Sequence, residues 1–222
     1  MPRIRAATIE EHHEMVWADL TEAMRHLLLE RDYDSINMGH IAARAGLARN
    51  TLYNYAQDKR SLVLELARRA SRPLVELVTT IAARSSDSAA NRLTGIVEEI
   101  LTASTNPAMG LMFLPNATSL VAEFQEGPEN PFTTIEAQVE TVVCDGVTRG
   151  EFRAVEDVRL VVELLSGAMT AAGSRVSRDP SSLAATVRAA QHIVLASLTP
   201  DGDRPSTSQR DQVAQGSVNP RA

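Results

Sequence analysis

The segment IAARAGLARNTLYNY, residues 41–55, decides the fold of this chain. It holds two short stretches of helix-forming side chains, and Gly46 between them can take the positive φ angle that a tight turn needs. Ala42 and Ala45 are small enough to let the second helix cross close over the first, and Leu52 can point inward to fix the crossing angle. The segment therefore predicts a helix-turn-helix.

The outward face of the second helix is polar and rich in hydrogen-bonding groups. Because each residue turns by about 100° around a helix axis, an inward Leu52 places Asn50 and Asn54 nearly opposite the core. The flanks and edge of the same face are formed by Thr51, Tyr53 and Arg49. Arginine can bond guanine through two hydrogen bonds, asparagine can do so with adenine, and threonine can contact a thymine methyl. This face predicts a surface that reads DNA.

We divide the candidate DNA contacts into two kinds. Arg49, Asn50 and Thr51 are the candidates for reading bases. The candidates for binding the phosphate backbone are Asn37, which is expected to cap the first of the two helices, and Tyr53, Asn54, Tyr55 and Lys59. Lys59 is the only lysine in the chain and opens the next helix, where its ammonium group can meet a phosphate.

The remainder of the chain predicts an all-α fold in which helices are separated by turn-rich breaks. The helices expected outside the central segment cover 11–30, 59–83, 88–104, 107–113, 116–125, 132–149, 156–175 and 181–198. We expect three parts: a helix-turn-helix domain over 1–58, a larger helical domain over 59–200, and a disordered tail over 201–222, whose composition cannot form a core.

The distribution of charge matters more than the net value of −6. Most of the net negative charge lies in residues 61–200, with 16 acidic against 11 basic side chains, whereas residues 44–60 carry four basic side chains against Asp58. Those four are Arg44, Arg49, Lys59 and Arg60. A local basic region on an acidic protein favours specific docking over indiscriminate coating of nucleic acid.

Composition and motifs exclude several classes of protein. No apolar run approaches the roughly 18–20 residues of a membrane span, and the N-terminus lacks the apolar core of a signal peptide. Cys144 is the only cysteine, so we expect a cytoplasmic protein, with a redox role for Cys144 left open. The histidines lack metal-binding spacing, and no catalytic motif is present. We therefore expect no metal, no cofactor and no enzymatic activity.

Over about its first 65 residues, the sequence resembles the tetracycline-repressor (TetR) family of bacterial regulators. The matching positions are Tyr33, residues 41–47, residues 51–55, Asp58-Lys59 and Leu62. The resemblance implies that Arg49, Asn50 and Thr51 read bases, and that Tyr53, Tyr55 and Lys59 hold phosphates.

The resemblance also implies an assembly and a mechanism. The last two helices, about 156–175 and 181–198, would pack against a second subunit as a four-helix bundle. The intervening helices would enclose a pocket for a small-molecule effector, whose binding would swing the helix that begins at Lys59. The expected function is a ligand-responsive regulator, a repressor by family analogy, released by its effector from a palindromic operator.

Three positions depart from the family pattern. Ala48 stands where a Ser or Thr cap is usual, which costs the second helix about 1 kcal/mol of capping. Ala56 replaces a usual Phe and removes a core anchor unless Trp17 or Tyr55 fills the gap. Asp32 replaces a frequent Gly. These changes affect stability and helix pose more than the proposed contacts.

Two questions stay open at this point. Met109, Met112, Phe113 and Phe124 offer flexible apolar surface suited to an effector pocket, although filling the core is the more frequent role for each such residue. The second is whether the helix-turn-helix still binds DNA. The alternative, favoured by the acidic net charge and the missing cap, is a helical small-molecule-binding protein or enzyme that has lost DNA binding.

Overall fold

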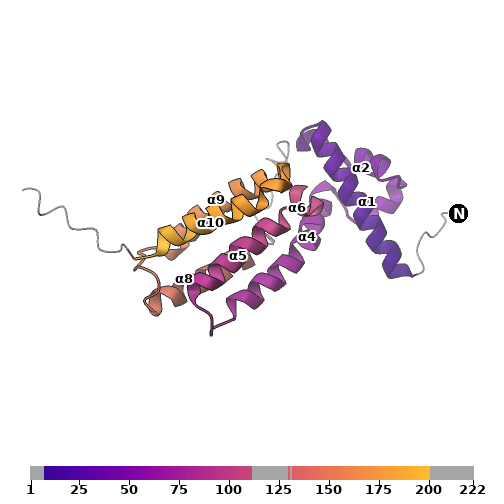
Figure 1. Cartoon of the computed structure of the whole chain (residues 1–222). Helices are drawn as coiled ribbons and strands as arrows, with labels where there is room; N and C mark the ends of the chain where they lie inside the picture. Colours follow the sequence, from indigo (N-terminus) through magenta and orange to yellow (C-terminus); the bar gives the residue numbers. More distant parts are fainter. Residues whose placement is uncertain (1–7, 112–129, 131, 201–222) are drawn as a thin grey trace, which may run out of the picture.

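The computed structural model describes residues 8–111, 130 and 132–200, and every regular element among them is helical (Figure 1). This confirms the predicted all-α fold. The helices are α1 (Ile9–Glu30), α2 (Met38–Arg44), α3 (Arg49–Tyr53), α4 (Lys59–Ala82), α5 (Ala89–Ala103), α6 (Pro107–Gly110), α8 (Thr133–Thr148), α9 (Val158–Arg178) and α10 (Leu183–Leu198), with short 3-10 turns at Tyr33–Ser35 and Pro180–Ser182. The expected helix over 116–125 and the expected tail over 201–222 lie outside the described residues.

Side-chain caps fix where the N-terminal helices begin. The Thr8 side chain accepts a hydrogen bond from the Glu11 backbone N–H at the start of α1. Asp58 caps α4 reciprocally with Ser61: its carboxylate accepts from the Ser61 backbone N–H, and the Ser61 hydroxyl accepts from the Asp58 backbone N–H. Caps of this kind satisfy backbone donors that have no partner within the helix. They explain why α4 begins at Lys59, as the sequence predicts.

The smaller body consists of α1, α2, α3 and the first turns of α4 around one hydrophobic core. α1 supplies fully buried side chains at helical spacing, Leu20, Met24 and Leu28 among them. α2 adds Ile41 and α3 adds Leu52, and neither of these is exposed at all. Figure 1 shows this body at the opposite end of the molecule from the turn between α4 and α5.

The larger body is a bundle in which α5 lies among α4, α8, α9 and α10 (Figure 1). Leu93, Ile96 and Leu101 of α5 are buried, so this helix is surrounded by its neighbours. No helix within residues 8–111 and 132–200 combines the length and the apolarity that crossing a lipid bilayer requires.

The two cores meet along α4 and at α6. The core of the smaller body takes residues of α4 up to Ala67, and that of the larger body begins at Leu74. Pro73 lies inside α4 between these two groups. Just after α5, Met109 packs into the larger core while Leu111 packs into the smaller one, and both are buried. A shift of α6 or α4 therefore affects both bodies.

A buried arginine ties together the helix ends of the larger bundle. Arg92 of α5 is 3% exposed, and its Nη1 donates to the Ala82 carbonyl at the end of α4 over 3.0 Å. Its Nη2 forms an ion pair with Asp145 of α8, which also pairs with Arg149. The Arg92 and Arg149 guanidinium groups lower the pKa of the Asp145 carboxyl. Charge-assisted contacts of this kind fix the relative positions of three helices.

Candidate nucleic-acid interface

The turn between α2 and α3 has the geometry that the sequence predicts. Gly46 has a φ angle of 68°, and the Leu47 N–H donates to the Ala42 carbonyl over 2.9 Å, which closes the end of α2. A hypothetical Cβ on Gly46 would meet no atom within 4 Å. The position is thus selected for its backbone angle and not for lack of space.

Replacing Gly46 with alanine should lower the free energy of unfolding by about 1 kcal/mol, the cost of an L-residue at positive φ. Urea denaturation followed by circular dichroism measures it. Gly95→Ala, in the middle of α5 with its nearest neighbour 3.6 Å from the added Cβ, is the control. It should leave stability unchanged or raise it by about 0.5–1 kcal/mol. Equal destabilisation by both changes would contradict a role for the φ angle.

α3 presents the predicted base-reading residues to solvent. Leu52 is fully buried, and Arg49 and Asn50 are exposed while Thr51 is half-buried. The structure therefore brings all three onto one accessible surface. α3 is only five residues long, and Ala48 provides no side-chain hydrogen bond at its start. The missing cap weakens the first turn of this short helix.

The predicted backbone contacts differ in accessibility. Tyr53 is 43% exposed and Asn54 is also exposed, so both can reach a ligand. Tyr55 is half-buried, with its ring edge-to-face against Trp17 at 5.4 Å between centroids, and its burial raises the pKa of the phenol. Ala56 is buried in the core of the smaller body, and both Trp17 and Tyr55 pack against that core.

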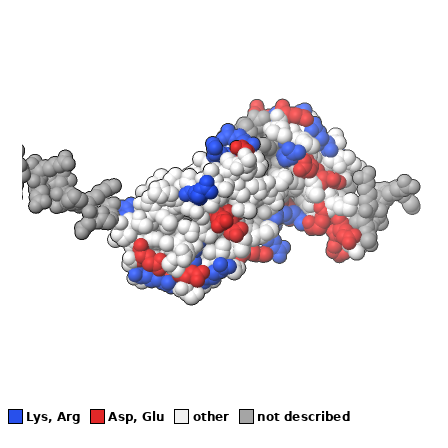
Figure 2. All heavy atoms as spheres, in the orientation of Figure 1, with Lys and Arg blue, Asp and Glu red and all other residues white. Residues whose placement is uncertain are grey.

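Two of the four predicted basic side chains have partners within the chain. Arg44 forms two hydrogen bonds with Glu30, at 2.8 and 2.6 Å, and this pair lowers the pKa of the Glu30 carboxyl. Figure 2 shows both basic and acidic side chains over the smaller body, with acidic side chains gathered at its lower right-hand end. The Glu30 carboxylate, which lies outside residues 44–60, therefore offsets one of the four positive charges of that segment.

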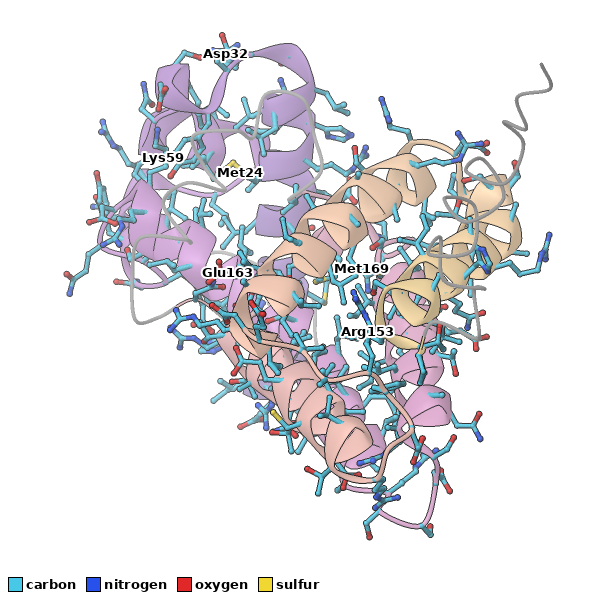
Figure 3. All side chains as sticks on the ribbon, turned by 90° about the vertical axis from the view of Figure 1, so that its left-hand side faces the viewer. Met24, Asp32, Lys59, Arg153, Glu163 and Met169 are labelled. Atoms are coloured by element: carbon cyan, nitrogen blue, oxygen red, sulfur yellow. The ribbon has the colours of Figure 1, made fainter. Side chains whose placement is uncertain are left out.

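Lys59 is the second of these residues (Figure 3). Its ammonium donates to the Tyr33 carbonyl over 2.8 Å and lies 3.8 Å from the centroid of the Tyr33 ring. This contact joins the start of α4 to the turn after α1, and sequence reasoning missed it. An ammonium group has three N–H donors, so this bond leaves donors with which Lys59 can still meet a phosphate.

Asn37 caps α2, as predicted, and its side chain is used in doing so. Its Oδ1 accepts from the His40 backbone N–H over 3.0 Å, and the His40 ring accepts from the Asn37 backbone N–H. The first turn of α2 is thus held in place at the edge of the candidate interface.

The predicted effector-pocket residues fall in different places. Met109 is buried in the larger core, whereas Met112, Phe113 and Phe124 lie outside the described residues. A cavity of about 60 Å³ instead lies among α5, α8, α9 and α10. Its wall includes Val97, Val139 and Met169, and Met109 does not line it. No cluster of His, Cys, Asp or Glu in the described part of the chain could hold a metal ion.

The sequence is similar to one known family of bacterial regulatory proteins and to individual transcriptional regulators. Residues 20–66 match the profile of the bacterial regulatory proteins of the tetR family. An uncharacterized HTH-type transcriptional regulator of Mycobacterium tuberculosis is 27% identical over 146 residues, which cover 66% of this chain and 72% of the relative.

Solved structures share the fold over more than four-fifths of this chain. FadR of Bacillus subtilis in complex with stearoyl-CoA has a TM-score of 0.64 at 14% identity, covering 83% of this chain and 98% of FadR. SmeT, the repressor of the Stenotrophomonas maltophilia multidrug efflux pump SmeDEF, has a TM-score of 0.63 at 16% identity, covering 87% of this chain and 94% of SmeT. SmeT has also been solved in complex with triclosan.

Proposed function

Since this chain is a TetR-family regulator whose residues 20–66 match the family's profile, we propose that it is a cytoplasmic repressor released from a palindromic operator by a small-molecule effector. The observation that carries the proposal is α3, which stands on a buried Leu52 with Arg49 and Asn50 exposed. In this proposal residues 1–58 bind DNA, residues 59–200 bind the effector and a second copy, and the protein is not an enzyme.

We propose a homodimer formed through α9 and α10. Both helices carry an apolar stripe that points to solvent, with Leu160 50%, Leu164 68% and Ile193 55% exposed. The stripes consist of Leu160, Leu164, Gly167, Ala168 and Ala171 on α9, and Ala185, Ala189, Ile193 and Ala196 on α10. The surface over these helices is largely free of charged residues (Figure 2). Small and apolar side chains in such rows suit close packing against two identical helices.

A two-fold dimer would present two copies of α3 to one duplex. Recognition helices of such dimers enter successive major grooves about 34–36 Å apart, so the operator should be an inverted repeat. The effector must bind the two states of the dimer with different affinity, because equal affinity would shift nothing.

Substitutions of Arg49 and Lys59 test the proposed function. Arg49→Ala should relax base preference, and Lys59→Ala should weaken binding to all sequences about equally and lower the salt dependence by about one released ion. Fluorescence anisotropy with an operator duplex and a scrambled duplex, at several salt concentrations, measures both effects. The same loss of specificity in both variants would refute this division of roles. An unchanged salt dependence in Lys59→Ala would show that Lys59 contacts no phosphate and serves only its contact with Tyr33.

Pro73 is the proposed hinge of α4. A proline within a helix has no N–H to donate to the carbonyl four residues earlier, here that of Arg69. The break lies just before Leu74, the first buried residue that α4 gives to the larger core, against which the half-buried Ala70 also packs. A movement of the larger bundle can therefore reorient the smaller body at this point.

Pro73→Ala should restore one backbone hydrogen bond and slow amide exchange in the surrounding turns by about fivefold, which corresponds to about 1 kcal/mol. Hydrogen exchange measured by mass spectrometry on peptides around residues 69–77 tests this. Peptides from α10 serve as the internal control and should not change. Unchanged exchange around residue 73 would show that α4 is no weaker there than elsewhere.

A further inference from the structure

The described residues that line the cavity among α5, α8, α9 and α10 are almost all apolar. Ten of its twelve lining residues are aliphatic or methionine, and the two others are Glu136 and Ser166. Each helix of the group contributes, so the cavity lies inside the bundle and is no groove on one helix. Such a wall offers many apolar contacts and few hydrogen bonds.

The charges around this cavity disfavour a negatively charged occupant. No lysine, arginine or histidine is among the described residues that line it, and its only charged group is the Glu136 carboxylate. The one arginine of α5, Arg92, is committed to the Ala82 carbonyl and to Asp145. A carboxylate or phosphate placed here would lose its hydration without gaining a cationic partner.

The size of the cavity limits its occupant further. At about 60 Å³ it is smaller than the roughly 150 Å³ cavity that is known to take up benzene. A single ring would therefore require some widening. Met169 lines the cavity from α9 and is only partly buried (Figure 3). Because methionine is flexible and readily repacks, it is the side chain best suited to make room.

We propose that the effector is a compact, uncharged and mainly apolar molecule of about one ring, held in this cavity. Anionic molecules, including fatty acids and acyl-CoA esters, would be excluded by the apolar wall and by Glu136. The inference rests on the proposed function in one respect, namely that a ligand of the larger bundle is the effector. Ser166 supplies the one hydroxyl among the described residues of the wall, and it can orient a polar substituent of the ring.

Two probes that differ mainly in charge test this proposal on the full-length chain: para-cresol, neutral at pH 7, and para-toluate, an anion. Calorimetric titration should give para-cresol a dissociation constant at least about tenfold lower than that of para-toluate, because the anion must be desolvated. Para-cresol should also raise the melting temperature. Equal binding of both probes, tighter binding of para-toluate, or no binding of para-cresol would overturn the proposed class.

Substitutions of opposite size locate the site. Val139→Phe should fill the cavity and weaken para-cresol binding at least about tenfold, whereas Val139→Ala should enlarge it and leave binding equal or tighter. Both changes disturb the packing of α8, so a merely structural effect would weaken binding in both variants and would overturn the assignment to this cavity.

DNA binding measured on the same samples separates this inference from the proposed function. A chain that holds an operator but prefers the anion retains its proposed function and has a different class of effector. A chain that binds para-cresol in the cavity but holds no duplex contradicts the proposed function, while the ligand class stands.

Discussion

Replacing Arg92 with methionine is expected to lower the free energy of unfolding by about 2–3 kcal/mol. Methionine can occupy most of the volume of this buried side chain, but it offers no donor to the Ala82 carbonyl or to Asp145. The connection between the ends of α4, α5 and α8 is then lost. Urea denaturation followed by circular dichroism gives the difference.

Arg72→Met is the matched control for Arg92. The Arg72 guanidinium pairs with Glu76 on the exposed side of α4 and is 78% exposed. Exposed ion pairs contribute little, so this variant should stay within about 0.5 kcal/mol of the natural chain. Similar losses in the two variants would show that the buried contacts of Arg92 do not stabilise the bundle.

The same contacts give the stability of the fold a dependence on pH. The pKa of Asp145 is lowered in the folded chain from its usual 3.8, with the hydrogen bond from Arg92 as the largest cause. The unfolded chain therefore binds a proton more readily than the folded one. The contribution of this pair is fully present above the usual pKa and is lost as the pH falls below it. In Arg92→Met, part of this acid sensitivity should disappear.

Leu164→Arg is expected to convert a dimer to monomers and to weaken operator binding by about 10²–10⁴-fold. Loss of one subunit removes the second recognition helix and with it the gain from linked binding. Leu164 is 68% exposed in the single chain, so the charge should not disturb its own core. Light scattering gives the oligomeric state, and anisotropy with the operator duplex gives the affinity.

Leu77→Arg on α4 serves as the control, since that leucine is also exposed, at 37%. It should leave both the mass and the affinity unchanged. A dimer that persists in Leu164→Arg would place the interface elsewhere. A natural chain that is monomeric at the concentrations tested would reject the proposed assembly.

The features that could be predicted from sequence depend on local rules. Gly46 predicts a turn because few other residues tolerate a positive φ angle. A buried Leu52 predicts that Arg49 and Asn50 are exposed, because side chains are spaced regularly around a helix. Asn37 and Asp58 identify helix starts because their side chains cap backbone donors. Each of these inferences needs only residues a few positions apart.

The features that were missed depend on contacts between distant segments. Arg44 of α2 forms hydrogen bonds with Glu30 at the end of α1. Lys59 donates a hydrogen bond to the carbonyl of Tyr33, 26 positions earlier in the chain. Spacing along the chain gives no sign of either, and so the basic region looked more positive than it is. The cavity is likewise a product of four packed helices, and Met109, the one predicted pocket residue that the structure describes, does not line it.

The central claim is tested most directly by the DNA that the full-length chain selects from a pool of random duplexes. We expect the bound sequences to share an inverted repeat with half-site centres about 10–10.5 base pairs apart or a multiple of that spacing. Arg49→Ala should lose preference at one position of each half-site. Recovery of no common sequence, or of a preference that Arg49→Ala leaves unchanged, would contradict recognition of DNA by α3.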